Sequence, residues 1–166
     1  MESRAKAFGH AAHPMLIVFP LGLLATAVIF DIIYLFTDRQ GLAMAAGYMI
    51  AAGIIGGLVA AIFGLVDFLS IPSGTRAKRI GALHGTGNVI VVGLFAISWL
   101  IRVNAGAWEP NGAALFFSFA GAILALGTAW LGGELVERLA VGVDEGANLN
   151  APNSMSGPAR MRRAQG

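Results

Sequence analysis

Four apolar stretches, each long enough to cross a lipid bilayer, occupy most of this 166-residue chain. An α-helix needs about 20 apolar residues to cross about 30 Å of hydrocarbon. A soluble protein of this size could not bury so much apolar surface. The sequence therefore predicts an all-α integral membrane protein, a four-helix bundle with four transmembrane helices, over Met15–Phe36, Leu42–Ile71, Ala82–Val103 and Ala113–Val136.

The composition supports this interpretation and excludes several kinds of chemistry. Charged residues make up 12% of the chain, whereas a soluble domain has about 25%. The chain has no cysteine, which excludes disulfides and thiolate metal ligands. Its basic residues flank the apolar stretches, so we assign them to topology and lipid contacts and expect no nucleic-acid partner. The sequence has no nucleotide-binding loop, nucleophile elbow or metalloprotease motif, and we expect no catalytic residues.

The distribution of basic residues predicts how the helices are oriented. Cytoplasmic segments of membrane proteins carry an excess of Lys and Arg. If the chain crosses the membrane four times, nine basic residues lie on the side of the termini and two on the other side. We therefore expect both termini in the cytoplasm and a multi-pass protein of the cell inner membrane. The nine residues are Arg4, Lys6, Arg76, Lys78, Arg79, Arg138, Arg160, Arg162 and Arg163, and the two are Arg39 and Arg102.

The chain divides into one transmembrane domain, residues 9–143, and a tail, residues 144–166. The tail is rich in Asn, Pro, Gly, Ser and Arg, and such segments rarely fold alone, so we expect a disordered cytoplasmic tail. Within the second span, Ala52, Gly56, Ala60 and Gly64 recur every four residues. Such a ridge of small residues lets another helix approach closely. We interpret it as packing within the bundle, and alternatively as a homo-oligomer interface.

Each of the four helices delivers polar side chains to the cytoplasmic end of the bundle. His10 and His13 precede the first span, and Asp67 lies near the end of the second. His84 and Asn88, four residues apart, share one helix face at the start of the third span, and Glu134 lies near the end of the fourth. Ionisable groups within spans are costly and normally face the bundle interior. We therefore predict a polar pocket at this end.

Three imidazoles and two carboxylates are side chains that bind a divalent transition metal, so we predict metal ligands among His10, His13, Asp67, His84 and Glu134. Alternatively, His13 and His84 hold the iron of haem b from both sides, with Asn88 hydrogen-bonded to a ligand. Structural alternatives remain open: Glu134 can pair with Arg138, Asp67 can pair with the basic loop after the second span, and His84 with Asn88 can join helices.

Asp31 lies apart from this pocket, about 24 Å along the first helix from Met15. Arg102 and Arg39 are the basic residues near the same end of the bundle. We predict a structural ion pair between Asp31 and Arg102, or alternatively between Asp31 and Arg39.

Several short motifs occur along the four spans. They are, in chain order, Gly9–Pro14, Phe19-Pro20, Asp31, Gly64-x-x-Asp67, His84-x-x-x-Asn88, Gly132–Val136 and Gly142-Val143. Their order and spacing resemble a bacterial membrane-protein family catalogued as domain of unknown function 2231. The resemblance covers about residues 9–143 and implies a four-helix membrane domain without an established activity. In this chain Val18 and Leu139 occupy positions where family members often have histidine, so two candidate ligands are absent.

Three functional hypotheses follow. The first is a metal- or haem-binding membrane protein that transfers electrons or handles metal ions, with a membrane redox or metal-handling partner. The second is a non-catalytic accessory protein whose buried polar network sets helix packing. The third is a small transporter or channel, which would need to oligomerise because four helices enclose little space for a permeation path.

Overall fold

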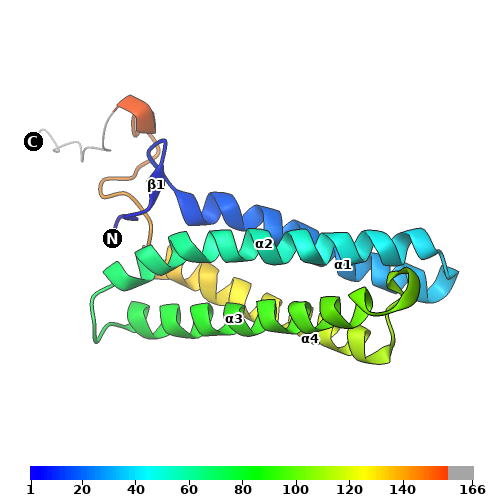
Figure 1. Cartoon of the computed structure of the whole chain (residues 1–166). Helices are drawn as coiled ribbons and strands as arrows, with labels where there is room; N and C mark the ends of the chain where they lie inside the picture. Colours follow the sequence, from blue (N-terminus) through cyan, green and yellow to red (C-terminus); the bar gives the residue numbers. More distant parts are fainter. Residues whose placement is uncertain (157–166) are drawn as a thin grey trace, which may run out of the picture.

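Four long helices run alongside one another in the computed structural model, which describes residues 1–156 (Figure 1). They are α1 (Ala12–Thr37), α2 (Gln40–Ser70), α3 (Arg76–Val103) and α4 (Gly112–Gly133). Each is long and apolar enough to cross a membrane. The predicted all-α fold with four candidate spans is therefore confirmed.

Side-chain caps explain where two of the helices begin. The Thr75 hydroxyl oxygen accepts a hydrogen bond of 3.1 Å from the Lys78 backbone N–H at the start of α3. The Asn111 side-chain oxygen accepts one of 2.9 Å from the Ala114 N–H at the start of α4. Both satisfy backbone donors that the first turn of a helix leaves free. The α3–α4 loop contains a short 3₁₀ turn, η1 (Gly106–Trp108).

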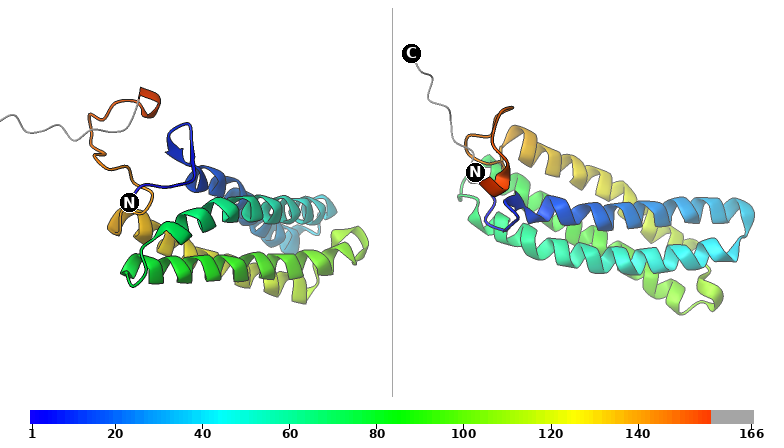
Figure 2. Two further views of the ribbon diagram at one scale, coloured as in Figure 1. Left: turned by 60° about the vertical axis from the view of Figure 1, so that its left-hand side comes forward. Right: turned by 90° about the horizontal axis from the view of Figure 1, so that it is seen from above.

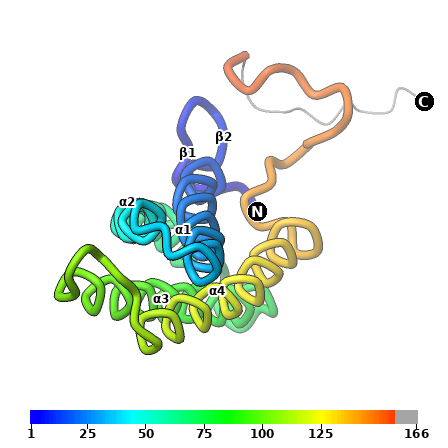
Figure 3. Tube along the Cα trace, turned by 90° about the vertical axis from the view of Figure 1, so that its right-hand side faces the viewer, coloured from blue at the N-terminus to red at the C-terminus, as the bar shows by residue number. Residues whose placement is uncertain are grey.

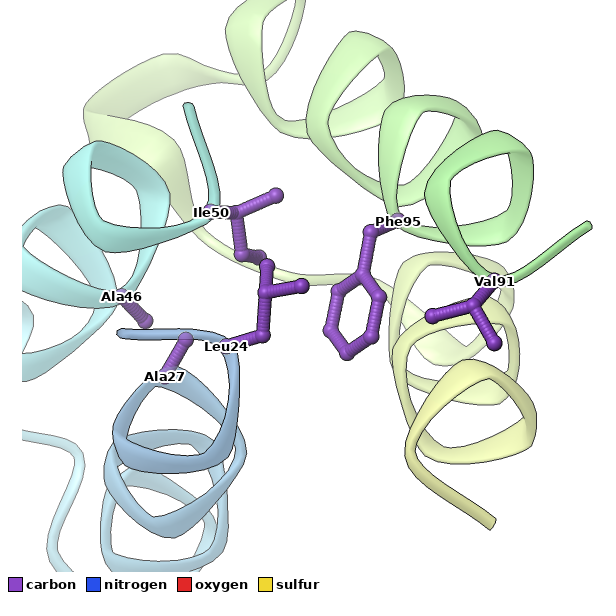
Figure 4. Packing of buried hydrophobic residues seen from close by; sticks show 6 residues of the cluster. All are labelled: Leu24, Ala27, Ala46, Ile50, Val91 and Phe95. Carbon is purple, nitrogen blue, oxygen red and sulfur yellow. The ribbon is translucent and has the colours of Figure 1, made fainter. Parts of the chain in front are cut away.

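The bundle consists of two antiparallel hairpins, α1 with α2 and α3 with α4 (Figures 1 and 3). They meet through a thin apolar core (Figure 4), made of Leu24, Ala27, Ala46, Ile50, Val91 and Phe95. Large apolar side chains on the outer surface stay exposed, such as Ile123 at 72% and Leu126 at 74%. This distribution is typical of a protein whose outer surface contacts lipid.

The small residues of α2 form the close contact between α1 and α2. A methyl group placed on Gly56 would lie 2.8 Å from the Phe19 ring, and one on Gly53 would lie 2.7 Å from Leu24. The ridge therefore packs within the bundle, as we favoured from the sequence, because it faces α1.

The segments before α1 and after α4 pack together at one end of the bundle (Figure 2). They include a two-stranded antiparallel hairpin, β1 (Lys6–Ala7) and β2 (His10–Ala11), and a 3₁₀ turn, η3 (Ser154–Ser156). The Lys6 ammonium contacts Glu2 at 2.8 Å and Asp144 at 2.6 Å. Its hydrogen bond lowers the pKa of Glu2, and the bond to Asp144 raises the pKa of Lys6.

The first part of the predicted tail contacts the N-terminal segment. Residues 144–156 hydrogen-bond to the N-terminal segment, through Asp144 with Lys6 and through the Glu145 N–H with Glu2. Residues 157–166, the rest of the expected disordered tail, lie outside the described residues. Both terminal segments lie at the same end of the bundle (Figures 1 and 2). Their cytoplasmic location remains a prediction.

Candidate functional site

His13 lies in the first turn of α1 and points toward α2. Its Nδ1 lies 2.8 Å from the Ala60 carbonyl oxygen, which can only accept a hydrogen bond. We therefore assign the proton to Nδ1 and a free lone pair to Nε2. Gly64 makes room for the ring, because a Cβ at that position would lie 2.9 Å from Nδ1. The small-residue ridge of α2 thus determines where this imidazole lies.

His84 is held in the same way on the other hairpin. Its Nδ1 lies 2.8 Å from the Thr128 carbonyl oxygen of α4, so Nδ1 donates and Nε2 keeps its lone pair. The Thr128 hydroxyl donates to Asn88 Oδ1 at 3.0 Å, and Asn88 Nδ2 donates to the His84 carbonyl at 3.0 Å. Asn88 Nδ2 also lies 3.2 Å from His84 Nε2. Thr128 and Asn88 therefore fix this imidazole together.

Thr128 was not among the residues predicted from the sequence. A threonine inside a span is weak evidence of a site, because its hydroxyl often donates to a carbonyl of its own preceding turn. The Thr128 hydroxyl also makes such a hydrogen bond, to the Ala125 carbonyl at 3.0 Å. Its other feature is a close helix contact: a methyl group on Gly87 of α3 would lie 2.5 Å from the Thr128 methyl. The approach of α3 to α4 at Gly87 positions the carbonyl that holds His84.

The two imidazoles face each other across the boundary between the hairpins. The ring centroids of His13 and His84 are 6.3 Å apart, and the ring planes are nearly perpendicular, at 88°. Each ring is anchored to a carbonyl within its own hairpin. The rings are therefore presented by two separate units of the fold.

Asp67 does not join the imidazoles. Its carboxylate accepts hydrogen bonds from the Ser3 hydroxyl at 2.8 and 2.9 Å, from the Arg4 N–H at 2.8 Å and from the Ala5 N–H at 3.2 Å. The structure thus shows other partners than the basic residues after α2, an alternative left open from the sequence, and Lys78 in the first turn of α3 donates to the Phe68 carbonyl at 2.7 Å. Asp67 anchors the N-terminal segment to the end of α2.

Glu134 and His10 also have other partners. The α4 helix ends in a π-helical turn, η2 (Glu134–Arg138), and Glu134 Oε1 pairs with Arg76 Nη2 at 2.5 Å. The alternative of an i,i+4 pair with Arg138 is therefore wrong. His10 lies in β2, outside the bundle, with its Nε2 3.2 Å from the Ser154 hydroxyl.

The predicted five-residue metal site is therefore not assembled. Within residues 1–156, no three His, Asp or Glu side chains lie close enough together to hold one ion. The sequence placed Asp67, Glu134, His13 and His84 at one depth, but a shared depth does not bring them together, because Asp67 bonds to the N-terminal segment and Glu134 pairs with Arg76 at the start of α3. Of the predicted ligands, His13 and His84 are the two that face each other.

A second polar cluster lies toward the opposite end of the bundle. Arg102 Nη1 and Nη2 donate to the two carboxylate oxygens of Asp31 at 2.7 and 2.6 Å, and neither residue has exposed surface. Ser98 Oγ accepts from Arg102 Nε at 3.3 Å, and Ser118 Oγ donates to Asp31 at 3.4 Å. Of the two partners that the sequence offered Asp31, the structure shows Arg102. This bidentate pair joins the two hairpins.

The fold and these polar clusters define a small multi-pass helical membrane protein with four candidate spans. A family model described as "Predicted membrane protein (DUF2231)" matches residues 9–145, and the chain therefore belongs to this family. No curated protein and no solved structure matches the chain. The family has no known function.

Proposed function

We propose that this protein holds one metal centre, a haem iron or a single transition-metal ion, between the imidazoles of His13 and His84, for electron transfer or metal handling. One observation carries the proposal. Two imidazoles from different hairpins lie in a T-shaped, edge arrangement with ring centroids 6.3 Å apart, and each has Nδ1 bonded to a backbone carbonyl, which leaves Nε2 as the potential ligand atom.

The way each ring is held supports this role. Histidines that bind metals almost always donate their other ring N–H to a carbonyl, a carboxylate or water, which fixes the tautomer and the ring orientation. His13 and His84 both have this arrangement, with Nδ1 2.8 Å from a carbonyl oxygen. Neutral imidazole also suits the bundle interior, where a charged ligand would be costly.

The spacing of the rings supports a shared ligand as well. A metal–nitrogen distance of about 2.0 Å plus a ring radius of roughly 1.1 Å puts two opposing imidazole centroids about 6 Å apart. The centroids of His13 and His84 are 6.3 Å apart. His13 and His84 would likewise be the residues that hold a haem iron. When bound, a haem or copper centre would accept and donate single electrons.

The location of the site suggests the partner. His13 lies in the first turn of α1, on the side of the two terminal segments. The excess of basic residues on that side supports a cytoplasmic location of both termini in an inner membrane. Electrons or metal ions would then be exchanged with a membrane redox or metal-handling partner near the cytoplasmic leaflet.

A second candidate function, a non-catalytic accessory protein, is favoured by a different observation. Apart from Trp99 Nε1, the buried side-chain polar atoms of residues 1–156 have partners in the chain itself, and Asn88 Nδ2 lies within hydrogen-bond distance of His84 Nε2. A network satisfied in this way can set helix packing without any ligand. The two candidates differ in whether His84 Nε2 binds a metal or only Asn88.

Spectroscopic titration separates the two candidates. Protein purified in detergent is titrated with ferric haem, and separately with Cu(II) and Zn(II), and the absorption spectrum and bound metal are measured. The proposal predicts saturable binding of one equivalent to the wild type, lost in His13→Ala and in His84→Ala. His10→Ala is the matched control and should bind normally, since His10 lies outside the bundle. Binding that is absent, or unchanged in both variants, supports the accessory role.

A further inference from the structure

The hairpin that precedes α1 has an unusual residue at its tip. The register pairs Lys6 with Ala11 and Ala7 with His10, which leaves Phe8 and Gly9 as a two-residue turn. Both have positive φ, 52° and 82°, as a type I′ turn requires. Asn, Asp and Gly are favoured at such positions, whereas a bulky side chain is a genuine outlier. Even so, Phe8 lies there with 79% of its surface exposed.

The tail holds the backbone of this turn and leaves the Phe8 ring free. The Ser154 hydroxyl donates to the Phe8 carbonyl at 3.2 Å. Gly9 packs so closely on Ser154 that a Cβ would lie 2.9 Å from its backbone oxygen. The polar side chains of the strands are occupied as well, Lys6 by two carboxylates and His10 by Ser154. The group that this hairpin presents outward is therefore apolar.

Hydrogen bonds to α2 set the depth of the hairpin. The Ala5 N–H, one residue before β1, donates to Asp67. Asp67 lies between Leu65 and Leu69, whose side chains are 55% and 67% exposed on the outer surface of a candidate span. The hairpin is thus attached at a level where the helices still present apolar side chains outward. In a bilayer, this level is where acyl chains meet headgroups.

The hairpin also extends outward from the bundle. Seen along the bundle, β1 and β2 extend outward past α1, away from the other three helices (Figure 3). In the side view the hairpin rises across the direction of the helix axes, level with the last turns of α2 (Figure 1). It therefore lies over the lipids that surround α1 and not over the centre of the bundle.

We propose that Phe8 is a membrane-interface anchor, inserted at the boundary between headgroups and acyl chains beside the start of α1. Aromatic and large apolar side chains bind this boundary. A contact of the Phe8 ring with lipid would explain why the turn keeps a bulky residue in a disfavoured conformation. The anchor fixes the depth of Ala12, where α1 begins, and hence of the first turn of the helix. The inference does not depend on a bound metal.

The absence of native cysteine permits a direct test by spin labelling in liposomes of phosphatidylethanolamine and phosphatidylglycerol. A nitroxide, itself apolar, is attached at Phe8→Cys, and at Ser73→Cys as a control in the exposed α2–α3 loop at the same end. Collisions with oxygen, which enters lipid, and with a water-soluble nickel complex are measured by EPR. If Phe8 is an anchor, the nitroxide at position 8 should collide several-fold more with oxygen than with the nickel complex. The nitroxide at position 73 should collide more with the nickel complex.

Two results would overturn the proposal. Nickel access at position 8 equal to that at position 73 places the tip in water, and shielding from both reagents places it against protein, such as a second copy. A second label tests native Phe8. With the nitroxide at Met155→Cys, beside the turn, Phe8→Asp should increase nickel access several-fold. No change would show that Phe8 does not hold the hairpin at the bilayer.

Discussion

Replacing Asp31 with alanine is expected to destabilise the bundle by about 3–5 kcal/mol, the cost of leaving a buried charge without its partner. The magnitude follows from the geometry. Arg102 is fully buried and donates to both Asp31 oxygens at 2.7 and 2.6 Å. Ser98 keeps one guanidinium N–H satisfied at 3.3 Å, but it cannot replace a carboxylate. Because the pair joins α1 to α3, the loss should weaken the contact between the hairpins.

The assay is unfolding of the purified protein in mixed micelles, followed by circular dichroism as the SDS fraction rises. The double variant Asp31→Leu/Arg102→Met removes both charges and keeps apolar volume, and such replacements of buried pairs are often neutral or stabilising. We expect it to recover most of the stability lost in Asp31→Ala. The reasoning is refuted if Asp31→Ala unfolds with the wild type, or if the double variant is no more stable than the single variants.

Three further changes test other contacts. The Cβ of Gly64→Ala would lie 2.9 Å from His13 Nδ1, so this variant should displace the imidazole and weaken haem or metal binding about tenfold or more. Gly22→Ala is the control, because it has open space around it, and it should bind normally. The titration with haem and metal ions measures both variants. Asp67→Ala should cost the N-terminal segment about 1–3 kcal/mol, seen as faster hydrogen exchange of its amides, and unchanged exchange would contradict the anchoring role. The Lys6 ammonium lowers the pKa of Glu2 below 4.5. The hydrogen bond from the Glu145 N–H to Glu2 should therefore be present above pH 4.5 and be lost as the pH falls through the lowered pKa. Hydrogen exchange of the Glu145 amide at a series of pH values would detect this loss.

The fold could be predicted from the sequence because its strongest signals are local. Each span is an uninterrupted apolar stretch, and the spacing of Gly56 and Gly64 indicates a close helix contact. The partner of Asp31 could also be predicted from the sequence. A buried carboxylate needs a cation at its own depth, and the sequence offered Arg102 and Arg39 as candidates.

The partners of Asp67 and Glu134 could not be predicted in the same way. Membrane depth follows from counting residues along a helix, but the choice of partner at that depth does not. Asp67 bonds to the N-terminal segment around Ser3, which has no periodic pattern that would indicate its path. Glu134 lies where α4 becomes a π-helical turn, so the i,i+4 spacing to Arg138 did not apply. Thr128 contributes through its backbone carbonyl, which any residue type has.

The amount of haem and transition metal per chain tests the central claim most directly. Full-length protein is purified from cells grown with added haem precursor, iron, copper and zinc, and is compared with the double variant His13→Ala/His84→Ala. We predict close to one haem or one metal ion per chain in the wild type and in His10→Ala, and almost none in the double variant. A wild type that carries neither, or a double variant that carries as much as the wild type, would contradict a centre shared by these two imidazoles.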